Sequence, residues 1–372
     1  MNYLFRVPSP ASDSSHESNS RICNRPHRFS DQSHDGANEG NDSSDDIPRE
    51  AVGTGDSSAM QLKFVTLDVF TSTPFKGNPL AIVTIPPGVA LTQEQKQTVA
   101  REFNLSETVF VHDVVDAAAS TERRIDIFTT TTELPFAGHP TIGSAVALEP
   151  QGVTTLITKA GPIAISSTAP GELRAVIPHN VRLHTRRFKD LKPLPTGLSA
   201  NAELAAAELD APVFSIVDGM TFALVELPSL ELLAAVEPGT IDLHPAELLD
   251  EGWHGTYVGR YHYVRTGSSK GQDGITIHNI RARMAEHGVE DPATGSAACA
   301  LSSYLGLREA EGASAPTTQR FFVTQGVEMG RESNISIEAR FTAGEGVPPR
   351  LESLFLGGRA TQVMRGTIRV EE

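Results

Sequence analysis

Residues 290–297 of the chain read EDPATGSA, and the apolar segment ACALSSYL follows directly at residues 298–305. Because nearly every side of that segment is apolar, it predicts a buried helix. Proline is tolerated in a first helical turn, and aspartate, threonine and serine accept hydrogen bonds from the free N–H groups there. A buried helix that begins with Gly295 and Ser296 leaves unpaired N–H groups, which favour a carboxylate or a phosphate as ligand.

A second stretch of the same kind lies earlier in the chain. Residues 136–148 read FAGHPTIGSAVAL, which again places a polar residue and a proline before Gly-Ser-Ala and an apolar helix. In this alignment His139 stands where Asp291 stands in the later stretch. Two such helix starts indicate an internally duplicated protein with one anion site between its halves.

Length, charge and cysteine content limit the class of protein. The 372 residues are enough for two domains, each with a substantial core. The formal charge of -15 argues against nucleic acid as a partner, because a phosphate backbone requires a basic surface. Cys23 and Cys299 offer no disulfide framework and no metal-type spacing, so we expect a reducing compartment, the cytoplasm. No run of 18 or more apolar residues occurs, so we expect no membrane span.

The beginning of the sequence differs from the rest. Residues 1–59 are rich in serine, aspartate and asparagine and lack apolar periodicity, which predicts a disordered acidic tail. They show neither the apolar stretch of a signal peptide nor the acid-poor composition of a transit peptide. Met60 directly precedes the first strand-like run and is a candidate alternative start, which N-terminal mass spectrometry of the native protein would settle.

Strand-like runs dominate from residue 62 onward, with few helical segments between them. Thr92 and Gln95 form a capping box before a helix at residues 97–103. A helix-like segment at residues 229–236 follows a pair of strands in the second half, as the earlier helix does in the first. Each half therefore reads as mostly strand around one central apolar helix, an α+β arrangement.

The repeated plan also predicts domain boundaries. The N-terminal domain covers residues 60–185 and is completed by the last strand, at about 362–372. The C-terminal domain covers residues 186–361.

Each candidate site residue has an ordinary structural explanation when taken alone. His139 would more often cap or pack a helix than catalyse a reaction, and Asp291 would equally be a helix cap. Glu107, beside a strand, would be a solvated acid or part of a turn. The repeat favours a functional role for His139 and Asp291, because they occupy matching places in the two halves.

Nucleotide and metal sites are not expected. Residues 138–144 have the glycine spacing of a phosphate-binding loop but lack the lysine that the loop needs. His254, His262 and His278 show neither of the spacings suited to zinc. Cys299, inside the small-residue helix, is expected to pack as a small hydrophobe.

Four motifs in the same order connect the chain to a known family. They are DVFT at 68–71 with GNPLA at 77–81, NLSET at 104–108, GHPTIG at 138–143, and EDPATGSA at 290–297. From Leu62 to its end the chain resembles the PhzF-like phenazine-biosynthesis family, which shares the diaminopimelate epimerase fold.

The resemblance implies a fold and a reaction. The fold has two pseudo-symmetric domains, each a curved, mostly antiparallel sheet around a central helix, with the active site in the cleft between them. The reaction is an isomerisation or epimerisation that moves a proton without a cofactor or a metal. Glu107 would be the acid/base, assisted by His139 and Asp291. Burial in a cleft is expected to raise the pKa of Glu107 toward neutrality, which suits a group that takes and returns a proton.

The resemblance also implies a binding site for the substrate carboxylate. Ser296, with the N–H groups of Gly138, His139 and Gly295, would hold it, and we include Asn78 of the GNPLA motif among the substrate-binding residues. Helix N-termini stabilise the negative charge that develops when a carbon beside a carboxylate loses its proton.

Two departures from related enzymes limit what carries over. Thiol-dependent epimerases of this fold place a cysteine at each helix start, and this chain has none there, so a two-thiol racemase is not expected. Residues 281–289 are shorter than the usual family segment and lack its Phe after Arg-Met, so the substrate of the phenazine enzyme is not assumed.

Three functions remain open from the sequence. The first is an isomerase of a small carboxylic acid or amino-acid derivative that uses Glu107 as acid/base. The second is an epimerase with Glu107 and Asp291 as opposed bases, and the third is a binding or scaffold protein that kept the fold. The expected partner is a small carboxylate, with neither nucleic acid nor membrane, and a homodimer is an expectation that the resemblance alone supplies.

Overall fold

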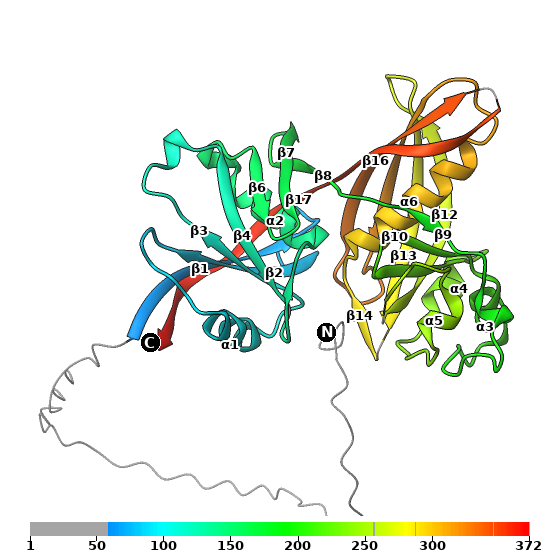
Figure 1. Ribbon diagram of the computed structural model, residues 1–372, viewed down its shortest axis with the longest axis horizontal. Coiled ribbons are helices and arrows are strands. Elements are labelled where there is room, and N and C mark those ends of the chain that lie inside the picture. Colours follow the sequence, from blue (N-terminus) through cyan, green and yellow to red (C-terminus); the bar gives the residue numbers. More distant parts are fainter. Residues whose placement is uncertain (1–58, 256, 287, 345, 372) are drawn as a thin grey trace, which may run out of the picture. The chain divides into compact units, whose positions relative to one another are not determined.

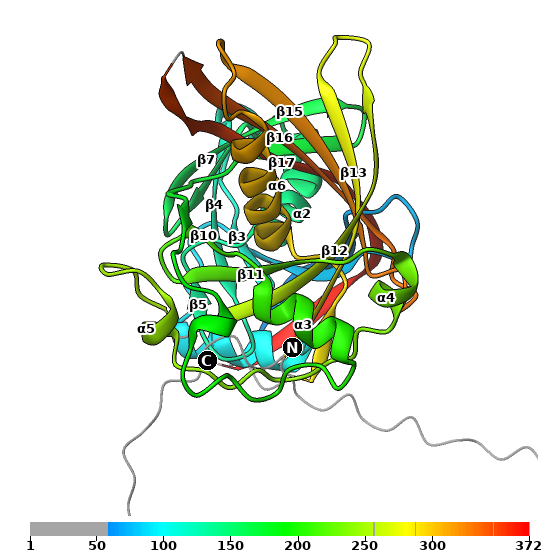
Figure 2. The same cartoon turned by 90° about the vertical axis from the view of Figure 1, so that its right-hand side faces the viewer.

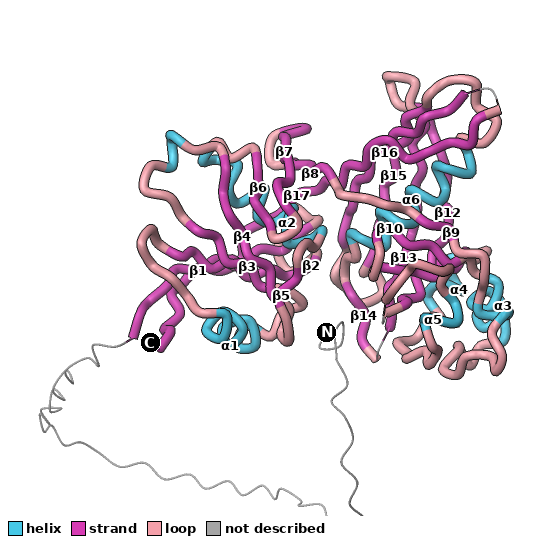
Figure 3. Tube along the Cα trace, viewed as in Figure 1, coloured by secondary structure: helices cyan, strands magenta, loops and turns pink. Residues whose placement is uncertain are grey.

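The computed structural model describes residues 59–255, 257–286, 288–344 and 346–371, which belong to one compact unit. This unit is a mixed, sheet-rich α+β structure with few helices (Figure 3). The expected α+β class is confirmed in this coarse sense. The predicted disordered tail lies outside the described residues except for Ala59, which begins the first strand.

The first half of the chain forms a sheet in which antiparallel and parallel pairs alternate. Its strands are β1 (Ala59–Val69), β2 (Asn78–Ile85), β3 (Thr108–His112), β4 (Glu122–Phe128), β6 (Thr155–Thr158) and β7 (Gly161–Ala169), with the short β5 (Glu133–Leu134) beside β4. The pairs β2–β3 and β4–β6 are parallel, whereas β1–β2, β3–β4 and β6–β7 are antiparallel. A parallel pair needs a crossover, and helices supply both of them.

The second half repeats this order of pairings. Its strands are β10 (Val213–Val217), β11 (Met220–Glu226), β12 (Val258–Lys270), β13 (Thr276–Glu286), β15 (Thr317–Gln325) and β16 (Ser333–Gly344), with β9 (Arg182–Leu183) beside β10 and β14 (Val289–Asp291) beside β13. Here β11–β12 and β13–β15 are parallel, and β10–β11, β12–β13 and β15–β16 are antiparallel.

One long strand, β17 (Val347–Glu371), belongs to both groups of strands (Figure 1). Its first part pairs with β16, its middle with β8 (Glu172–Val176), and its last part with β1 from Ala360 onward. A Cβ atom on Gly357 would lie 2.6 Å from Oγ of Ser336, and one on Gly358 would lie 2.5 Å from the ring of Phe70. The strand therefore needs two glycines where it passes between the groups.

Two apolar helices pack against the strands, one in each half of the chain. They are α2 (Gly138–Leu148), which contacts β1, β2, β3, β8 and β17, and α6 (Gly295–Glu309), which contacts β10, β11, β15, β16 and β17. Figure 2 shows both helices surrounded by strands. Most residues of each are buried, so the prediction of two buried apolar helices is confirmed.

The remaining helices lie between strands in the chain. They are α1 (Gln93–Phe103), α3 (Ala202–Asp210), α4 (Leu230–Ala234) and α5 (Pro245–Leu248), with short 3-10 turns η1 (Ala117–Ala119), η2 (Glu149–Gln151) and η3 (Phe188–Asp190). The capping box of α1 forms as expected, with Gln95 N donating to Thr92 Oγ1 and Thr92 N to Gln95 Oε1. The sequence analysis did not anticipate α3, although Asn201 caps it. Within the described ranges, no helix has the length and hydropathy to cross a membrane.

Candidate active site

The N-termini of α2 and α6 meet at two glycines. A Cβ atom added to Gly138 would lie 3.6 Å from the Cα of Gly295, and one added to Gly295 would lie 3.7 Å from the backbone N of His139. The cap residues Ala137 and Thr294 make no side-chain capping bond to the helix that each precedes, within the part of the chain that the structure describes. Two sets of first-turn N–H groups and two positive helix ends therefore converge on one small region, which suits an anion.

This geometry corrects the expected alignment of the two stretches. Because Gly138 faces Gly295, His139 corresponds to Ser296 and not to Asp291, a shift of five positions. The wrong alignment came from matching the two prolines, Pro140 and Pro292. Pro140 lies inside the first turn of α2, where no backbone N–H is needed, whereas Pro292 lies in the loop before α6.

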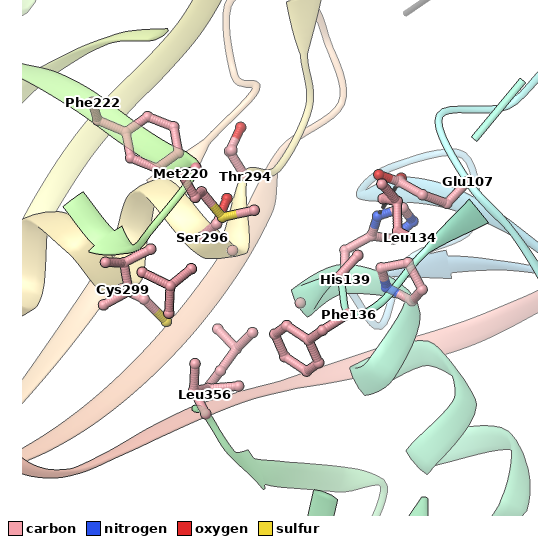
Figure 4. A pocket seen from close by; sticks show the side chains of 18 of the residues that line it. Glu107, Leu134, Phe136, His139, Met220, Phe222, Thr294, Ser296, Cys299 and Leu356 are labelled. Carbon is pink, nitrogen blue, oxygen red and sulfur yellow. Dashed lines mark ion pairs between the residues drawn. The ribbon is translucent and has the colours of Figure 1, made fainter. Parts of the chain in front are cut away.

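Glu107 and His139 form a buried ion pair beside these helix ends (Figure 4). Glu107 directly precedes β3, and His139 is the second residue of α2. Nδ1 of His139 lies 3.1 Å from Oε2 of Glu107, and both residues are more than 90% buried. Nε2 of His139 is buried without a hydrogen-bond partner among the described residues, and it belongs to a side chain that lines a cavity.

The expectation for the pKa of Glu107 is wrong in direction. Burial alone would raise this pKa, but attraction to His139 and hydrogen bonds from His139 and Ser106 outweigh it, and the pKa is lowered from its ordinary value. The sequence could not anticipate this result because the partner charge comes from a different element. Glu107 is therefore a carboxylate at neutral pH.

Asp291 has the raised pKa that was expected of Glu107. It ends β14 and is 6% exposed. Burial raises its pKa to about 7, and the nearby charge of Glu107 adds to the rise, although the hydroxyl of Thr294 and the charge of His139 act against it. Near neutral pH, the site thus contains an ionised Glu107 and an Asp291 that is about half protonated.

Asn78 connects the two sides of the site through its side-chain amide. Its Nδ2 donates to Oδ1 of Asp291 at 2.8 Å and to the backbone O of Ala293 at 3.0 Å. Its Oδ1 accepts from Ser106 Oγ at 3.5 Å, next to Glu107. Asn78 is 2% exposed and is not among the described residues that line the cavity. Its geometry favours a role in positioning Asp291, and its substrate-binding role stays a prediction.

Gln325, which the sequence analysis did not consider, holds the loop before α6. Its Oε1 accepts from Thr294 N at 3.1 Å and from the hydroxyl of Tyr261 at 2.9 Å. Its Nε2 donates to the backbone O of Asp291 at 2.8 Å and to Thr294 Oγ1 at 3.0 Å. The Thr294 hydroxyl in turn donates to Oδ2 of Asp291 at 2.7 Å. No local pattern around Gln325 could have identified it, because its partners are 31 or more positions away.

These groups border a cavity of about 450 Å³. Glu107, His139, Asp291, Gly138, Gly295 and Ser296 all line it, so the structure brings six of the seven expected site residues to one cavity. The sequence analysis missed its apolar side, which we call the apolar wall. The wall consists of Leu134, Phe136, Ile216, Met220, Phe222 and Leu356. Cys299 also lines the cavity and is 1% exposed, and burial raises the pKa of its thiol, so it stays a neutral, small apolar side chain.

The arrangement is suited to proton transfer on a bound carboxylic acid. Two helix N-termini and the Ser296 hydroxyl can hold a carboxylate, and an ionised and a protonated carboxyl stand beside it. Pairs of titratable groups whose surroundings displace their pKa values in opposite directions are typical of a general base and a general acid.

Comparisons with known proteins agree with this fold. A family model described as phenazine biosynthesis-like protein matches residues 67–366. An uncharacterised isomerase of Mesorhizobium japonicum is 31% identical over 327 residues, covering 82% of this chain and 98% of that protein. Trans-2,3-dihydro-3-hydroxyanthranilate isomerase of Pseudomonas chlororaphis is 31% identical over 318 residues, with coverage of 82% and 98%. A crystal structure of a PhzF-family phenazine biosynthesis protein of Bacillus anthracis has the same fold, with a TM-score of 0.60 at 20% identity, covering 83% of this chain and 99% of that one.

These relatives define the class of protein as an isomerase. The chain belongs to the phenazine biosynthesis-like family, also called the PhzF family.

Proposed function

We propose that the protein is a cofactor-independent isomerase that moves a proton within a small carboxylic acid, with Glu107 as the acid/base. One observation carries this proposal. Two buried carboxyl groups with oppositely displaced pKa values, Glu107 and Asp291, line one cavity together with two converging helix N-termini. Positioned bases and acids of this kind accelerate proton transfer by roughly 10²–10⁴-fold.

The proposed reaction begins with a carbon acid held by its carboxylate. The N–H groups of Gly138, His139 and Gly295 and the Ser296 hydroxyl bind the carboxylate. Glu107 removes a proton from a carbon next to the carboxylate or to a double bond conjugated with it. The C–H bond breaks, and its electron pair spreads into the conjugated system, where the helix N-termini stabilise the added negative charge.

The second step returns a proton to a different atom of the same molecule. The proton on Glu107 exchanges with solvent, a new C–H bond forms with the proton that Glu107 then carries, and Glu107 becomes a carboxylate again. Protonated Asp291 stays neutral during this sequence, so that it adds no second negative charge beside the substrate. The ion pair with His139 holds the Glu107 side chain in place.

Proton exchange with solvent tests this function. The wild type and Glu107→Gln are incubated in deuterated water with trans-2,3-dihydro-3-hydroxyanthranilate, on which the Pseudomonas relative acts, and with a pool of small carboxylic and amino acids. We expect mass gain and a new isomer for at least one compound with the wild type, and neither with Glu107→Gln. A Glu107→Gln enzyme with full turnover would rule out the proposed role. Tight binding without label in either enzyme would favour a binding protein.

Epimerisation is the second candidate, and one observation favours it. Glu107 and Asp291 come from different halves of the chain, and near neutral pH Glu107 is ionised while Asp291 is about half protonated. If they act on opposite faces of one carbon, Glu107 removes a proton and Asp291 supplies another. Deuterium would then appear with inverted configuration at the original carbon, whereas isomerisation moves a double bond.

We also propose that the two halves are pseudo-symmetric domains, each a curved and mostly antiparallel sheet around a central helix. The repeated order of antiparallel and parallel pairings supports this, and so does the equivalent place of α2 and α6. The last strand would complete the N-terminal domain through its pairing with β1. The cytoplasm is the proposed location, because the two cysteines offer no disulfide framework.

A further inference from the structure

The charges that line the cavity set limits on its ligand. Four acidic side chains border it, and no lysine or arginine is present among the described lining residues. The acids are Glu107, Asp218, Glu286 and Asp291. Glu286 is already held by a buried Arg260, at 2.8 Å between Oε2 and Nε, so it has a counter-charge outside the cavity. Among the described lining residues, the groups that can attract an anion include the two helix N-termini, the Ser296 hydroxyl and His139.

A second carboxylate on the ligand would lack a partner in this cavity. Beside the buried Glu107 and Asp291, or against the apolar wall, it would be an unpaired charge in buried surroundings, which is strongly disfavoured. An apolar ligand body, in contrast, can cover the wall. Figure 4 shows that Met220 and Phe222 lie with Ser296 on the side of the cavity away from Glu107, while Phe136 and Leu356 lie between. A ligand anchored at the helix ends therefore has Glu107 and His139 on one side and Met220 and Phe222 on the other.

We propose that the substrate is a monocarboxylic acid with an apolar body, and that the apolar wall is the subsite that binds this body. This inference rests on the proposed function, from which it takes the position of the ligand carboxylate at the helix N-termini. The wall includes side chains from both halves of the chain, so both contribute to selectivity. Dicarboxylic acids of similar size are excluded by charge rather than by shape.

Calorimetric titration with a matched pair of acids tests this inference. The probes are 3-phenylpropionate and 3-(4-carboxyphenyl)propionate, which differ by one carboxylate. We expect the monocarboxylate to bind at least tenfold more tightly, and Phe136→Ala and Met220→Ala to weaken its binding by roughly tenfold each. Both side chains are only partly buried, so these variants should fold. The exposed Phe322 and Met329 provide matched controls, because Phe322→Ala and Met329→Ala should leave binding unchanged.

Equal or tighter binding of the dicarboxylate would overturn the inference, and so would wall variants that bind the monocarboxylate like the wild type. Deuterium exchange distinguishes this failure from failure of the proposed function. Exchange confined to polar or dicarboxylic acids would support the isomerase and overturn the apolar subsite. Selective binding of the apolar acid without exchange into any acid would support the subsite and contradict the isomerase.

A second inference comes from the hydrogen bonds of Gln325. The orientation of its amide is fixed by the backbone, because Thr294 N can only donate and the carbonyl of Asp291 can only accept. Nε2 must therefore point toward Thr294 Oγ1, which accepts its hydrogen at 3.0 Å. The hydroxyl hydrogen of Thr294 is then directed to Oδ2 of Asp291, at 2.7 Å.

We propose that Gln325 is a positioning residue that fixes the Thr294 hydroxyl as a hydrogen-bond donor to Asp291. Such a donor favours the charged form of the carboxyl and opposes the effect of burial. Four other titratable groups act on Asp291 electrostatically. They are Glu107 just before β3, His139 on α2, Tyr257 just before β12, and Tyr261 on β12. The Thr294 donor limits how far these surroundings raise the pKa of Asp291.

Carbon-13 NMR of aspartate carboxyl groups tests this role without a substrate. Asp291→Asn identifies the Asp291 signal in the titration of the full chain. We expect Thr294→Val to raise the pKa of Asp291 by about one unit or more, and Thr294→Ser to restore it. Gln325→Glu should also raise it, because a carboxylate at this position turns the Thr294 hydroxyl away from Asp291.

A purely structural role for this network predicts a different result. The variants would then lose stability while Asp291 titrated as in the wild type, which would overturn the proposal. The Thr294→Val and Thr294→Ser pair keeps the test decisive if Gln325→Glu does not fold, since valine and threonine have nearly the same shape.

Discussion

At Asp291 and Glu107, similar burial leads to opposite protonation because the neighbours differ. Glu107 has the His139 ring 3.1 Å away, and this partner more than offsets the cost of burying a carboxylate. Asp291 has neutral hydrogen-bond donors and the repulsive charge of Glu107, so burial determines its state. A base and an acid are thereby prepared in one cavity before any substrate binds.

Asp291→Asn should flatten the dependence of stability on pH. The pKa of Asp291 is about 7 in the folded chain and 3.8 ordinarily, so the folded state retains a proton that the unfolded state has released. Stability is therefore lost as the pH rises toward 7. Between pH 5 and 7 this loss is about 2 kcal/mol. Urea unfolding at several pH values measures it, and equal slopes for wild type and Asp291→Asn would contradict the raised pKa. Glu107 adds little slope in this window, because it is ionised in the folded state and mostly ionised in the unfolded state there.

His139→Gln should raise the pKa of Glu107, because the ion pair that lowers it is lost. The rate of deuterium exchange into a substrate would then fall on the acidic side at a higher pH than in the wild type. His112→Gln provides a control, since His112 pairs with Asp126 outside the cavity, at 2.7 Å. An unchanged acid limb in His139→Gln would show that His139 does not govern the ionisation of Glu107.

At the scale of elements, the helices α2 and α6 supply the anion site by where they begin. Gly295→Ala should weaken carboxylate binding by roughly tenfold while the protein still folds. Its Cβ would lie 3.0 Å from Cδ2 of Leu356 and 3.7 Å from Gly138 Cα, inside the gap between the helix ends. Calorimetric titration with 3-phenylpropionate measures the loss.

Gly306→Ala on the same helix is the matched control for that variant. Its Cβ would come within 2.2 Å of the Phe341 ring, far along the helix from the cavity. It should lower the free energy of unfolding by about 1–3 kcal/mol through overpacking and leave affinity unchanged. If both variants changed affinity equally, the effect of Gly295→Ala would not come from the helix N-terminus.

The sequence predicted elements well where the signal was local. The apolar residues of α2 and α6, and the Thr92 and Gln95 cap, are contiguous in the chain. The sequence also placed Glu107, His139 and Asp291 correctly as residues that line one cavity. The sequence comparison aligned the two repeated stretches wrongly. It matched His139-Pro140 with Asp291-Pro292, although the two helices begin at Gly138 and Gly295.

At the scale of the whole described unit, the loop after β15 in the second half hydrogen-bonds to the turn before β2 in the first half, next to the site. Arg331 donates from Nε to the backbone O of Gly77 at 2.8 Å and from Nη2 to Oδ1 of Asp68 at 2.6 Å. Gly77 N donates to Glu332 O at 3.0 Å. The loop thereby holds the turn that carries Asn78, while Gln325 at its start holds Asp291. Such contacts between distant segments leave no pattern in a single sequence, so neither Arg331 nor Gln325 could be identified from the sequence.

Arg331→Met should lower the free energy of unfolding by about 1–3 kcal/mol, because it leaves the buried Asp68 without its counter-charge. Urea unfolding measures the change. Arg359→Met is the control, since the Arg359 and Glu172 side chains are 44% and 30% exposed and such pairs contribute little. Similar losses in both variants would contradict a special role for the Arg331 contacts.

The central claim is that Glu107 carries the proton and Asp291 remains its neutral partner. The most direct test follows deuterium from solvent into recovered substrate and product with wild type, Glu107→Gln and Asp291→Asn. The account predicts label at the reacting carbon with the wild type, none with Glu107→Gln, and continued exchange with Asp291→Asn, because an amide preserves the neutral state. Exchange that persists in Glu107→Gln and disappears in Asp291→Asn would assign the proton to Asp291 and contradict the account.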